Sequence, residues 1–460
     1  MAAIMLVVGP LGLMPDAAWR TAALGVWMGI WWMTEAVPIA ATALLPLVLL
    51  PMLGVANMNV AAAPYANPVI FLFFGGFVLA AAFERSGLHK RLALSLLARV
   101  GTKPDRIIAG FMIAGGFLSM WVSNTAAVLM LLPLAKSLLK PAPPGADAVP
   151  ATAFEKALLL GIAYAATIGG FGTLIGTPPN ALLVGFLTQT HGIRVGFLDY
   201  MLIGVPIVVV AIPVTWFILT RVAFRVRDAE EVIAPGAIAS QRAALGPPAR
   251  SEWFVGIVAV CTATAWITQP LLARVAPGIS EAGISVACAV TLLVVPMDMK
   301  WNRALSWNDA ERIPWGVLVL FGGGLSLAAA IQDGGLARWI GDSVGTLHAV
   351  PPLVLVLVVT AVITLLTEFT SNTATAATFL PIASSLAVGA GMNPLVLVLA
   401  AGLAASNGFM MPVGTPPNAI VFAGQRLTIP EMARSGILVD VLFIVLITFV
   451  SYVLVAPALG

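Results

Sequence analysis

Charged residues are scarce in this chain of 460 residues: they make up only 9% of it, whereas hydrophobic residues make up 60% and the mean hydropathy is +1.02. A soluble domain carries about 25% charged residues. The composition therefore excludes a soluble enzyme and indicates an all-α polytopic membrane protein embedded in a lipid bilayer. The formal net charge of +3 is too small to favour binding to nucleic acid, so no such partner is expected.

Cysteine and histidine are also rare, with two and three copies. Cys261 and Cys288 lie in apolar segments and form no metal-ligand motif, so we interpret them as small core residues rather than as a disulfide. The histidines are scattered along the chain, and we expect no organic cofactor. No cleavable signal peptide is evident, because no basic residue precedes Arg20.

Against this apolar background, one polar tripeptide occurs twice. The first SNT, at 123–125, begins SNTAAVLMLLP, and the second SNT, at 371–373, begins SNTATAATFLP. Each is followed by a GTPPN segment, at 176–180 and at 414–418. Three consecutive polar residues inside a membrane segment are costly unless other groups satisfy them. Polar and Gly/Pro breaks at corresponding places in two halves are typical of transporters whose binding site lies between repeats.

The two halves align with a constant shift in residue number. Adding 248 takes Leu72 and Phe73 to a second Leu-Phe pair, and takes the first SNT to the second. Between the GTPPN segments the shift falls to 238, and the polar loop at 140–150 accounts for the difference. The sequence therefore predicts an internal repeat with a local insertion.

Positive charge predicts how the halves are oriented in the membrane. If alternate loops are cytoplasmic, they contain 19 of the 23 Lys and Arg residues, and the other side contains four. This asymmetry matches the excess of Lys and Arg in cytoplasmic loops. The assigned cytoplasmic loops are 85–106, 136–156, 221–252, 298–312 and 426–434. With this assignment the loop before the first SNT lies inside and its counterpart lies outside, so the sequence predicts inverted repeats.

Two segments permit more than one interpretation. Residues 3–14 form either a shortened first helix or an interfacial segment, and residues 107–139 form either one tilted span or two half-helices that meet at SNT as a re-entrant hairpin. We expect an N-terminal half at 1–220, with a hairpin at about 107–139 and a broken helix at about 157–189. A cytoplasmic linker follows at 221–252. The C-terminal half, at 253–460, is expected to have a hairpin at about 351–390 and a broken helix at about 394–424.

The residue types in these breaks suit both anions and cations. The N-terminal amides of a half-helix form a ready anion site, and Ser, Thr and Asn side chains donate to a carboxylate without adding charge. Their oxygens, with the carbonyls freed at a GTPPN break, suit a hard cation. In each GTPPN the Asn is expected to cap the following helix. Glu35 and Glu368 are intramembrane acids, for which function is the default hypothesis and structural satisfaction the alternative.

The motif set, with TEFTSNTATAATFLP, both GTPPN segments and WWMTEAVP near the start, closely resembles the divalent anion:sodium symporter family, whose members carry dicarboxylates, citrate or sulfate. The resemblance covers essentially the whole chain. It implies about eleven transmembrane helices with two re-entrant hairpins, a homodimer with separate scaffold and transport domains, and elevator-type movement of the transport domain.

The resemblance also implies a site. The first sodium site would consist of Ser119, Ser123, Asn124 and the backbone of Gly176, and the second of Thr367, Thr370, Asn372 and the backbone of Gly414. The residues that would hold the two substrate carboxylates or line their site are Ser123, Asn124, Thr125, Ser371, Asn372, Thr373, Thr177, Pro178, Thr415 and Pro416. The 248-residue shift relates Ser119 to Thr367, so both halves have a hydroxyl four residues before SNT.

The function that the sequence predicts is sodium-coupled symport of a C4-dicarboxylate such as succinate, fumarate or malate across the bacterial cytoplasmic membrane. No Arg or Lys stands beside either SNT, which favours cation coupling over an exchanger. A carrier of citrate, sulfate or another oxyanion, or a sodium/proton carrier, on the same scaffold is the alternative. A membrane-embedded hydrolase using Ser123 or Ser371 is a distant one, because no His or Lys base lies nearby in sequence.

Overall fold

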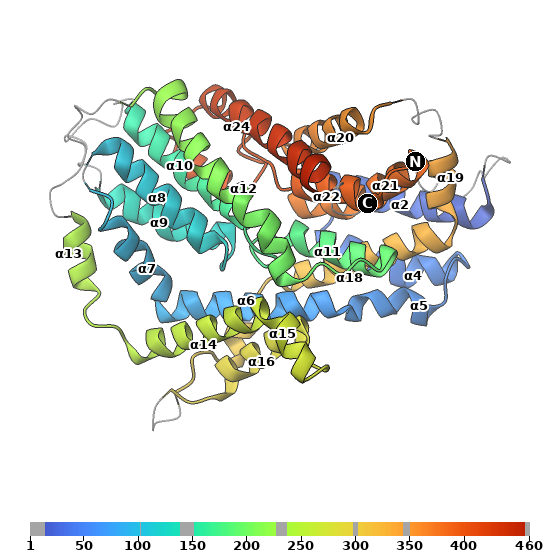
Figure 1. Ribbon diagram of the computed structural model, residues 1–460, viewed down its shortest axis with the longest axis horizontal. Helices are drawn as coiled ribbons and strands as arrows, with labels where there is room; N and C mark the ends of the chain where they lie inside the picture. Colours follow the sequence, from blue (N-terminus) through green and yellow to red (C-terminus); the bar gives the residue numbers. More distant parts are fainter. Residues whose placement is uncertain are drawn as a thin grey trace.

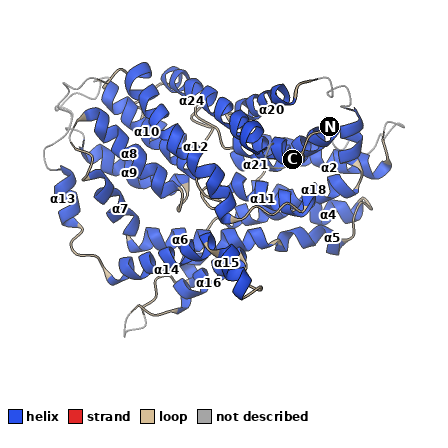
Figure 2. Cartoon of the chain, in the orientation of Figure 1, coloured by secondary structure: helices blue, strands red, loops and turns tan. Residues whose placement is uncertain are grey.

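The structure, a computed structural model, describes residues 14–101, 103–138, 151–226, 237–297, 302–343 and 350–455. Within these ranges the regular elements are helices and no strand occurs (Figure 2). A chain that spans a bilayer must satisfy its backbone polar groups internally, and a helix does so within one segment. The prediction of an all-helical fold is therefore confirmed. Residues 3–13, the loop at 140–150 and residues 227–236 of the linker lie outside the described residues.

The first half breaks its helices at the polar motifs. Its elements are α2 (Asp16–Thr34), α3 (Ile39–Thr42), α4 (Leu45–Met52), α5 (Met58–Ala62), η1 (Ala63–Ala66), α6 (Pro68–Ser86), α7 (Leu88–Leu97), α8 (Pro104–Ser119), α9 (Asn124–Leu138), α10 (Ala153–Gly170), α11 (Pro178–His191), α12 (Phe197–Phe217) and η2 (Ile218–Ala223). The first SNT separates α8 from α9, which pack against each other. Residues 104–138 are thus two helices rather than one tilted span.

The second half has the same sequence of breaks. Its elements are α13 (Ala237–Ala244), α14 (Arg250–Ile267), α15 (Gln269–Val275), α16 (Glu281–Val294), α17 (Trp307–Ala310), α18 (Trp315–Asp333), α19 (Leu336–Ser343), α20 (Pro352–Thr367), α21 (Asn372–Gly389), α22 (Pro394–Ala404), α23 (Pro416–Phe422), α24 (Ile429–Phe449) and η4 (Val450–Val455). The second SNT separates α20 from α21, and the second GTPPN spans the start of α23, with Gly414 and Thr415 before the helix and Pro416 as its first residue.

Few of these helices are long enough to cross a membrane alone. Within the described ranges five are long and apolar enough, and a sixth is added if α14 and α15, bent by 75°, count as one span. The five are Met58–Ser86, Ala153–Gly170, Phe197–Ala223, Trp315–Asp333 and Ile429–Val453. Other apolar helices, among them α20 and α22, have only 10–17 residues. Of these short helices, α20 ends just before the second SNT and α22 ends before the loop that leads to the second GTPPN.

The helices form two regions around a central layer. In Figure 1, α6 runs along one long side with α14, α15 and α16 outside it, while α8, α9, α10, α12 and α24 gather on the opposite side. Helices approach closely where glycines face neighbouring backbone: a Cβ at Gly75 would lie 2.3 Å from the Ser285 carbonyl oxygen, and one at Gly169 would lie 2.1 Å from that of Gly116. Small residues at such crossings are typical of membrane helix packing.

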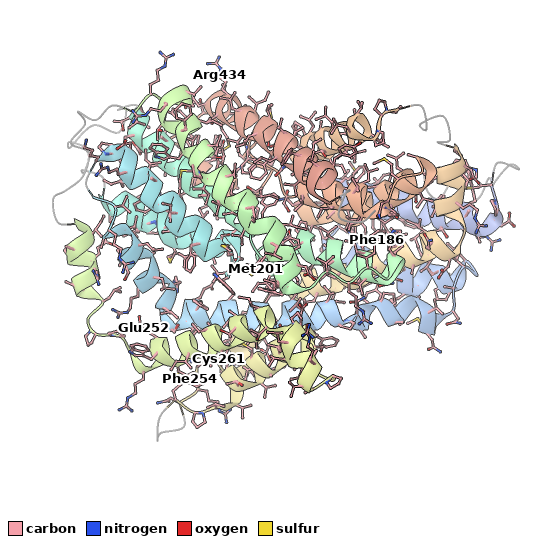
Figure 3. The ribbon with its side chains drawn as sticks, in the orientation of Figure 1. Phe186, Met201, Glu252, Phe254, Cys261 and Arg434 are labelled. Carbon is pink, nitrogen blue, oxygen red and sulfur yellow. The ribbon has the colours of Figure 1, made fainter. Side chains whose placement is uncertain are left out.

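The two cysteines differ in their surroundings. Cys288 is buried in α16, as a core residue should be, whereas Cys261 lies exposed on α14 (Figure 3). Both thiols are free. The interpretation as a core residue was therefore wrong for Cys261, because an apolar membrane helix exposes apolar side chains on the face that its protein neighbours do not cover.

Candidate functional site

Four breaks that are far apart in the sequence line a single cavity of about 1240 Å³. Its lining includes all of the residues that were expected to hold the substrate and six of the eight that were expected to bind sodium. These lining residues are Ser123, Asn124, Thr125, Gly176, Thr177, Pro178, Thr370, Ser371, Asn372, Thr373, Gly414, Thr415 and Pro416. The folded chain therefore brings the two SNT segments and the two GTPPN segments together.

The Asn124 amide at the first SNT is surrounded by oxygen atoms. The Ser119 hydroxyl donates to Asn124 Oδ1 at 2.6 Å. The carbonyl oxygens of Ala166 and Gly176 lie 3.2 and 3.3 Å from the same amide position. We call this group of oxygens the first cage. Turning the amide over satisfies this group, because the amide nitrogen then donates to all three oxygens. The surrounding hydroxyl and carbonyl oxygens are also of the type that hard cations prefer as ligands.

The second SNT has a matching arrangement, the second cage. The Thr367 hydroxyl lies 2.8 Å from Asn372 Oδ1 and 2.8 Å from the Ala405 carbonyl oxygen. The carbonyl oxygens of Ala405 and Gly414 both lie 3.3 Å from the Asn372 amide position. Neither Thr367 nor Ser119 lines the cavity, since both are fully buried behind it. The hydroxyls four residues before SNT therefore contact the asparagines from within the protein.

Both SNT segments lie at helix N-termini that face the cavity. Asn124 is the first residue of α9, and the Ser123 hydroxyl accepts a hydrogen bond from the Ala126 amide at 3.2 Å. Asn372 is the first residue of α21, and Ser371 makes no such side-chain cap. The first turn of a helix carries unpaired N–H groups and a partial positive charge. Two N-termini beside one cavity thus provide two anion-binding ends.

In the second sodium group, Thr370 differs from the other predicted ligands. Its hydroxyl donates to the Leu366 carbonyl oxygen at 2.9 Å and lies 2.7 Å from the Thr375 hydroxyl. Thr370 therefore faces the cavity but directs its side chain toward the turn of α20 and α21.

The asparagine of each GTPPN does not cap the following helix, so this prediction was wrong. Thr177 and Thr415 occupy the N-cap positions of α11 and α23, with extended backbone. Asn180 instead reaches back and donates to the carbonyl oxygens of Gly170 and Thr173, both at 2.9 Å. The asparagine stands inside the first helical turn, so its amide faces the end of the preceding helix.

The second GTPPN repeats this contact. Asn418 donates to the carbonyl oxygens of Gly408 and Met411, both at 3.0 Å. The residues correspond to Gly170 and Thr173 at the 238-residue shift. Each asparagine therefore fixes the non-helical loop whose carbonyl belongs to a cage.

Gly176 is required by this folded loop. A Cβ on Gly176 would lie 2.5 Å from the carbonyl oxygen of Gly170, a contact that no relaxed structure accommodates. The backbone can fold back on itself only because the side chain is absent. This folding directs the Gly176 carbonyl toward Asn124.

Of the two intramembrane acids considered in the sequence, only Glu368 is buried, with 1% of its surface exposed. Its carboxylate accepts hydrogen bonds from the amides of Phe409, Met410 and Met411 at 2.6, 2.9 and 2.8 Å. Glu368 therefore holds the loop between α22 and α23. Glu35 is exposed, lines the cavity and adopts a left-handed backbone conformation after α2.

Asp440 was missed in the sequence. It lies at the middle of α24, is only 2% exposed, and its carboxyl group is a neighbour of the Glu368 carboxyl group. An acid in the middle of the last apolar segment was a usable signal, because ionisable residues inside membrane spans are costly.

Charged residues line the cavity at one end. Arg85 and Asp309 form an ion pair there, and Arg312 lies exposed beside them. These three residues belong to, or border, loops that were assigned to the cytoplasmic side by charge.

Paired polar breaks around one cavity, in a chain whose described elements are apolar helices, are typical of a membrane transporter. The family model described as citrate transporter matches residues 29–402, and the chain belongs to this family. It is accordingly a multi-pass membrane protein and a transporter rather than an enzyme. In bacteria such a protein lies in the cytoplasmic membrane.

The chain is 44% identical to the sodium-dependent dicarboxylate transporter SdcS of Staphylococcus saprophyticus over 450 residues, covering 95% of this chain and 86% of the relative. It is 40% identical to SdcS of Staphylococcus aureus over 458 residues, covering 97% and 88%.

Two solved structures share the fold at low sequence identity. The YdaH transporter of Alcanivorax borkumensis has a TM-score of 0.59 at 16% identity and covers 94% of this chain and 98% of its own. MtrF of Neisseria gonorrhoeae, described within a class of antimetabolite efflux pumps, has a TM-score of 0.60 at 13% identity, with 97% of both chains covered. These similarities concern the fold alone.

Proposed function

We propose that this protein carries C4-dicarboxylates, such as succinate, fumarate or malate, into the cell together with sodium ions. The observation that carries the proposal is the pair of matching oxygen cages beside one cavity. The sodium-dependent dicarboxylate transporters that are 40–44% identical to the chain support both the ion and the substrate class.

The charges of the site suit a dianion that binds with cations. The substrate carboxylates bind at the N-termini of α9 and α21, where SNT side chains and first-turn amides donate to them. Thr177, Pro178, Thr415 and Pro416 complete the cavity wall. Because neither SNT has a neighbouring Arg or Lys, the sodium ions offset the negative charge of the substrate.

The cages provide the sodium sites. Hard cations prefer oxygen ligands, and each cage contains a hydroxyl and two backbone carbonyl oxygens beside the asparagine amide. The first site is assigned to Ser119, Ser123, Asn124 and Gly176, and the second to Thr367, Thr370, Asn372 and Gly414. No organic cofactor takes part.

The same proposal includes the architecture. The two halves, 1–220 and 253–460, are inverted repeats joined by a linker at 221–252, and α8–α9 and α20–α21 are re-entrant hairpins in a fold of about eleven membrane helices. The protein works as a homodimer whose transport domain moves like an elevator against a scaffold. The matching breaks and the charge asymmetry of the loops support this arrangement.

Uptake of labelled succinate into proteoliposomes tests the function. An inward sodium gradient should drive accumulation, and replacing sodium by potassium or choline should remove it. Uptake that is unchanged after this replacement would contradict sodium coupling. Competition by fumarate, malate, citrate and sulfate then defines the substrate: dicarboxylates should compete, whereas inhibition by citrate or sulfate alone would reassign it within the family.

A further inference from the structure

A second buried acid, on α24, lies beside Glu368. Asp440 is 2% exposed, and neither of its oxygens accepts a hydrogen bond from any donor in the described part of the chain. Its position on α24 is well defined, because Gly436, one turn earlier, packs directly on the loop that Glu368 holds. A Cβ at Gly436 would lie 2.3 Å from the Phe409 carbonyl oxygen. The face of α24 that carries Asp440 is therefore pressed against this loop.

The two carboxyl groups are in unequal environments. Glu368 accepts three backbone N–H bonds, which stabilise a carboxylate. Asp440 has no such donor, and its neighbour is the Glu368 carboxyl group itself. Two adjacent carboxylates away from water repel each other and lose their hydration. A proton on Asp440 removes this repulsion and lets its O–H donate to Glu368.

The pair is close to the second cage. A Cβ at Gly414 would lie 3.0 Å from Glu368 Oε2, and Gly414 contributes a carbonyl oxygen to the cage. A positive ion in the cage therefore acts on the carboxyl pair across a short distance in a medium of low polarity, where charges interact strongly.

Few other ionisable groups lie near Asp440 in the described part of the chain. The Tyr164 hydroxyl, on α10, faces the pair and contacts the Met432 carbonyl oxygen and the Ser435 hydroxyl at 3.3 and 3.4 Å. The carboxyl group of Glu368 is the acidic neighbour of Asp440. The remaining ionisable residues on α24 and on the elements that contact it are Glu431, Arg434, Glu155, Lys156, Asp199, Tyr200, Arg221 and Tyr452.

We propose that Asp440 is a proton-binding site that is linked to the second sodium site. Asp440 holds a proton when the second cage contains no sodium, and releases it to the water of the cavity when sodium binds. One O–H bond of the acid breaks, the carboxylate keeps the electron pair, and one positive charge leaves as another arrives. This inference rests on the proposed sodium function, and it makes the apparent sodium affinity of the protein depend on pH.

The first half has no equivalent pair. The residue at the Glu368 position, 248 residues earlier, is Met120. Gly204 packs on the Phe171 carbonyl oxygen as Gly436 packs on that of Phe409. These two glycines are 232 residues apart, and the same shift places Val208 at the position of Asp440. The proton site therefore belongs to the second cage alone.

Proton release on sodium binding tests the proposal directly. Sodium chloride, or choline chloride as a control, is added to the purified full-length protein in a weakly buffered solution with a pH indicator. We expect proton release on addition of sodium from the wild type and from Asp333→Asn, at an exposed acid outside the cavity, and none from Asp440→Asn. Release that persists in Asp440→Asn, or that is lost only in Asp333→Asn, would overturn the proposal.

Sodium-dependent thermal stability gives a second readout without substrate. Across about pH 5 to about pH 9, the half-saturating sodium concentration of the wild type should rise as pH falls, by at most about tenfold per pH unit, because proton and sodium oppose each other. Asp440→Asn should remove this dependence. Asp440→Val, which installs the first-half residue, should do the same and serves if the Asn variant is unstable.

The outcomes separate this inference from the proposed function. If sodium stabilises the wild type and Asp440→Asn with the same pH dependence, sodium binding stands and the Asp440 site is wrong. If sodium stabilises the wild type at no pH, the sodium function and the Asp440 site are both wrong.

Discussion

In the first half of the molecule, a hydroxyl connects the loop after α10 to the turn between α8 and α9: Thr173 donates to the Met120 carbonyl oxygen at 2.5 Å. In the second half, the connection runs the other way, because the Glu368 carboxylate accepts three amides of the corresponding loop. The cages themselves use the same hydroxyl, amide and carbonyl groups. The comparison indicates that the two proposed sodium sites have a common geometry and different surroundings, because within the described residues only the second has a buried acid beside its loop.

Of the substitutions considered, removal of either cage asparagine should have the largest effect on transport, because it leaves one cage without its central amide. Asn124→Ala and Asn372→Ala each remove an amide that faces three oxygens, and leaving such buried groups unpaired costs about 1–3 kcal/mol each. We expect sodium-driven succinate uptake to fall at least about 100-fold in each variant. Wild-type uptake by both variants in proteoliposomes would contradict the site assignment.

Adding a methyl group to each loop glycine compares the rigidity of the two cages. In Gly176→Ala the new Cβ meets backbone at 2.5 Å, whereas in Gly414→Ala the nearest atom is the Glu368 carboxylate oxygen at 3.0 Å. Overpacking costs about 1–3 kcal/mol, and we expect Gly176→Ala to lie at the upper end. Thermal unfolding and uptake measured side by side check this order; a larger loss in Gly414→Ala would contradict it.

Neutralising Glu368 tests whether its charge distinguishes the second cage from the first. In Glu368→Gln an amide NH₂ replaces one acceptor oxygen, so charge-assisted hydrogen bonds to the loop are lost. The sodium concentration for half-maximal uptake should rise about tenfold, equivalent to about 1.4 kcal/mol. Met120→Gln, at the matching first-half position, is the control and should leave this concentration within about twofold of wild type. Equal shifts in both variants would show that charge at this position does not distinguish the cages.

The smallest effect is expected at the contact between the halves. Arg426, after α23, donates to both oxygens of Glu155 at 2.7 and 2.8 Å, beside the start of α10. Its side chain is 37% exposed, so solvent screens the pair. Arg426→Gln should lower the unfolding free energy by less than about 1 kcal/mol and leave sodium dependence unchanged. A changed sodium dependence would show that the halves are coupled through this pair.

The sequence was sufficient for the helical class, the positions of the four breaks and the cavity-lining residues. It succeeded because polar triplets and Gly-Pro segments are conspicuous in apolar runs, and because they recur at a fixed shift. The role of Asn180 and Asn418 was mistaken, since an Asn after prolines resembles a cap and its reach to a distant loop is a tertiary contact. Asp440 was missed because its importance comes from Glu368, which lies 72 residues away in the sequence.

Equilibrium binding of labelled succinate to the purified protein, as sodium replaces choline at constant ionic strength, tests the two-cage site most directly. The wild type should bind succinate only with sodium, and with a sodium dependence steeper than that of a single ion, because both cages must fill. A variant with one weakened cage, Ser119→Ala or Thr367→Ala, should need more sodium for the same binding. Succinate binding of equal affinity with and without sodium would contradict the role of both cages.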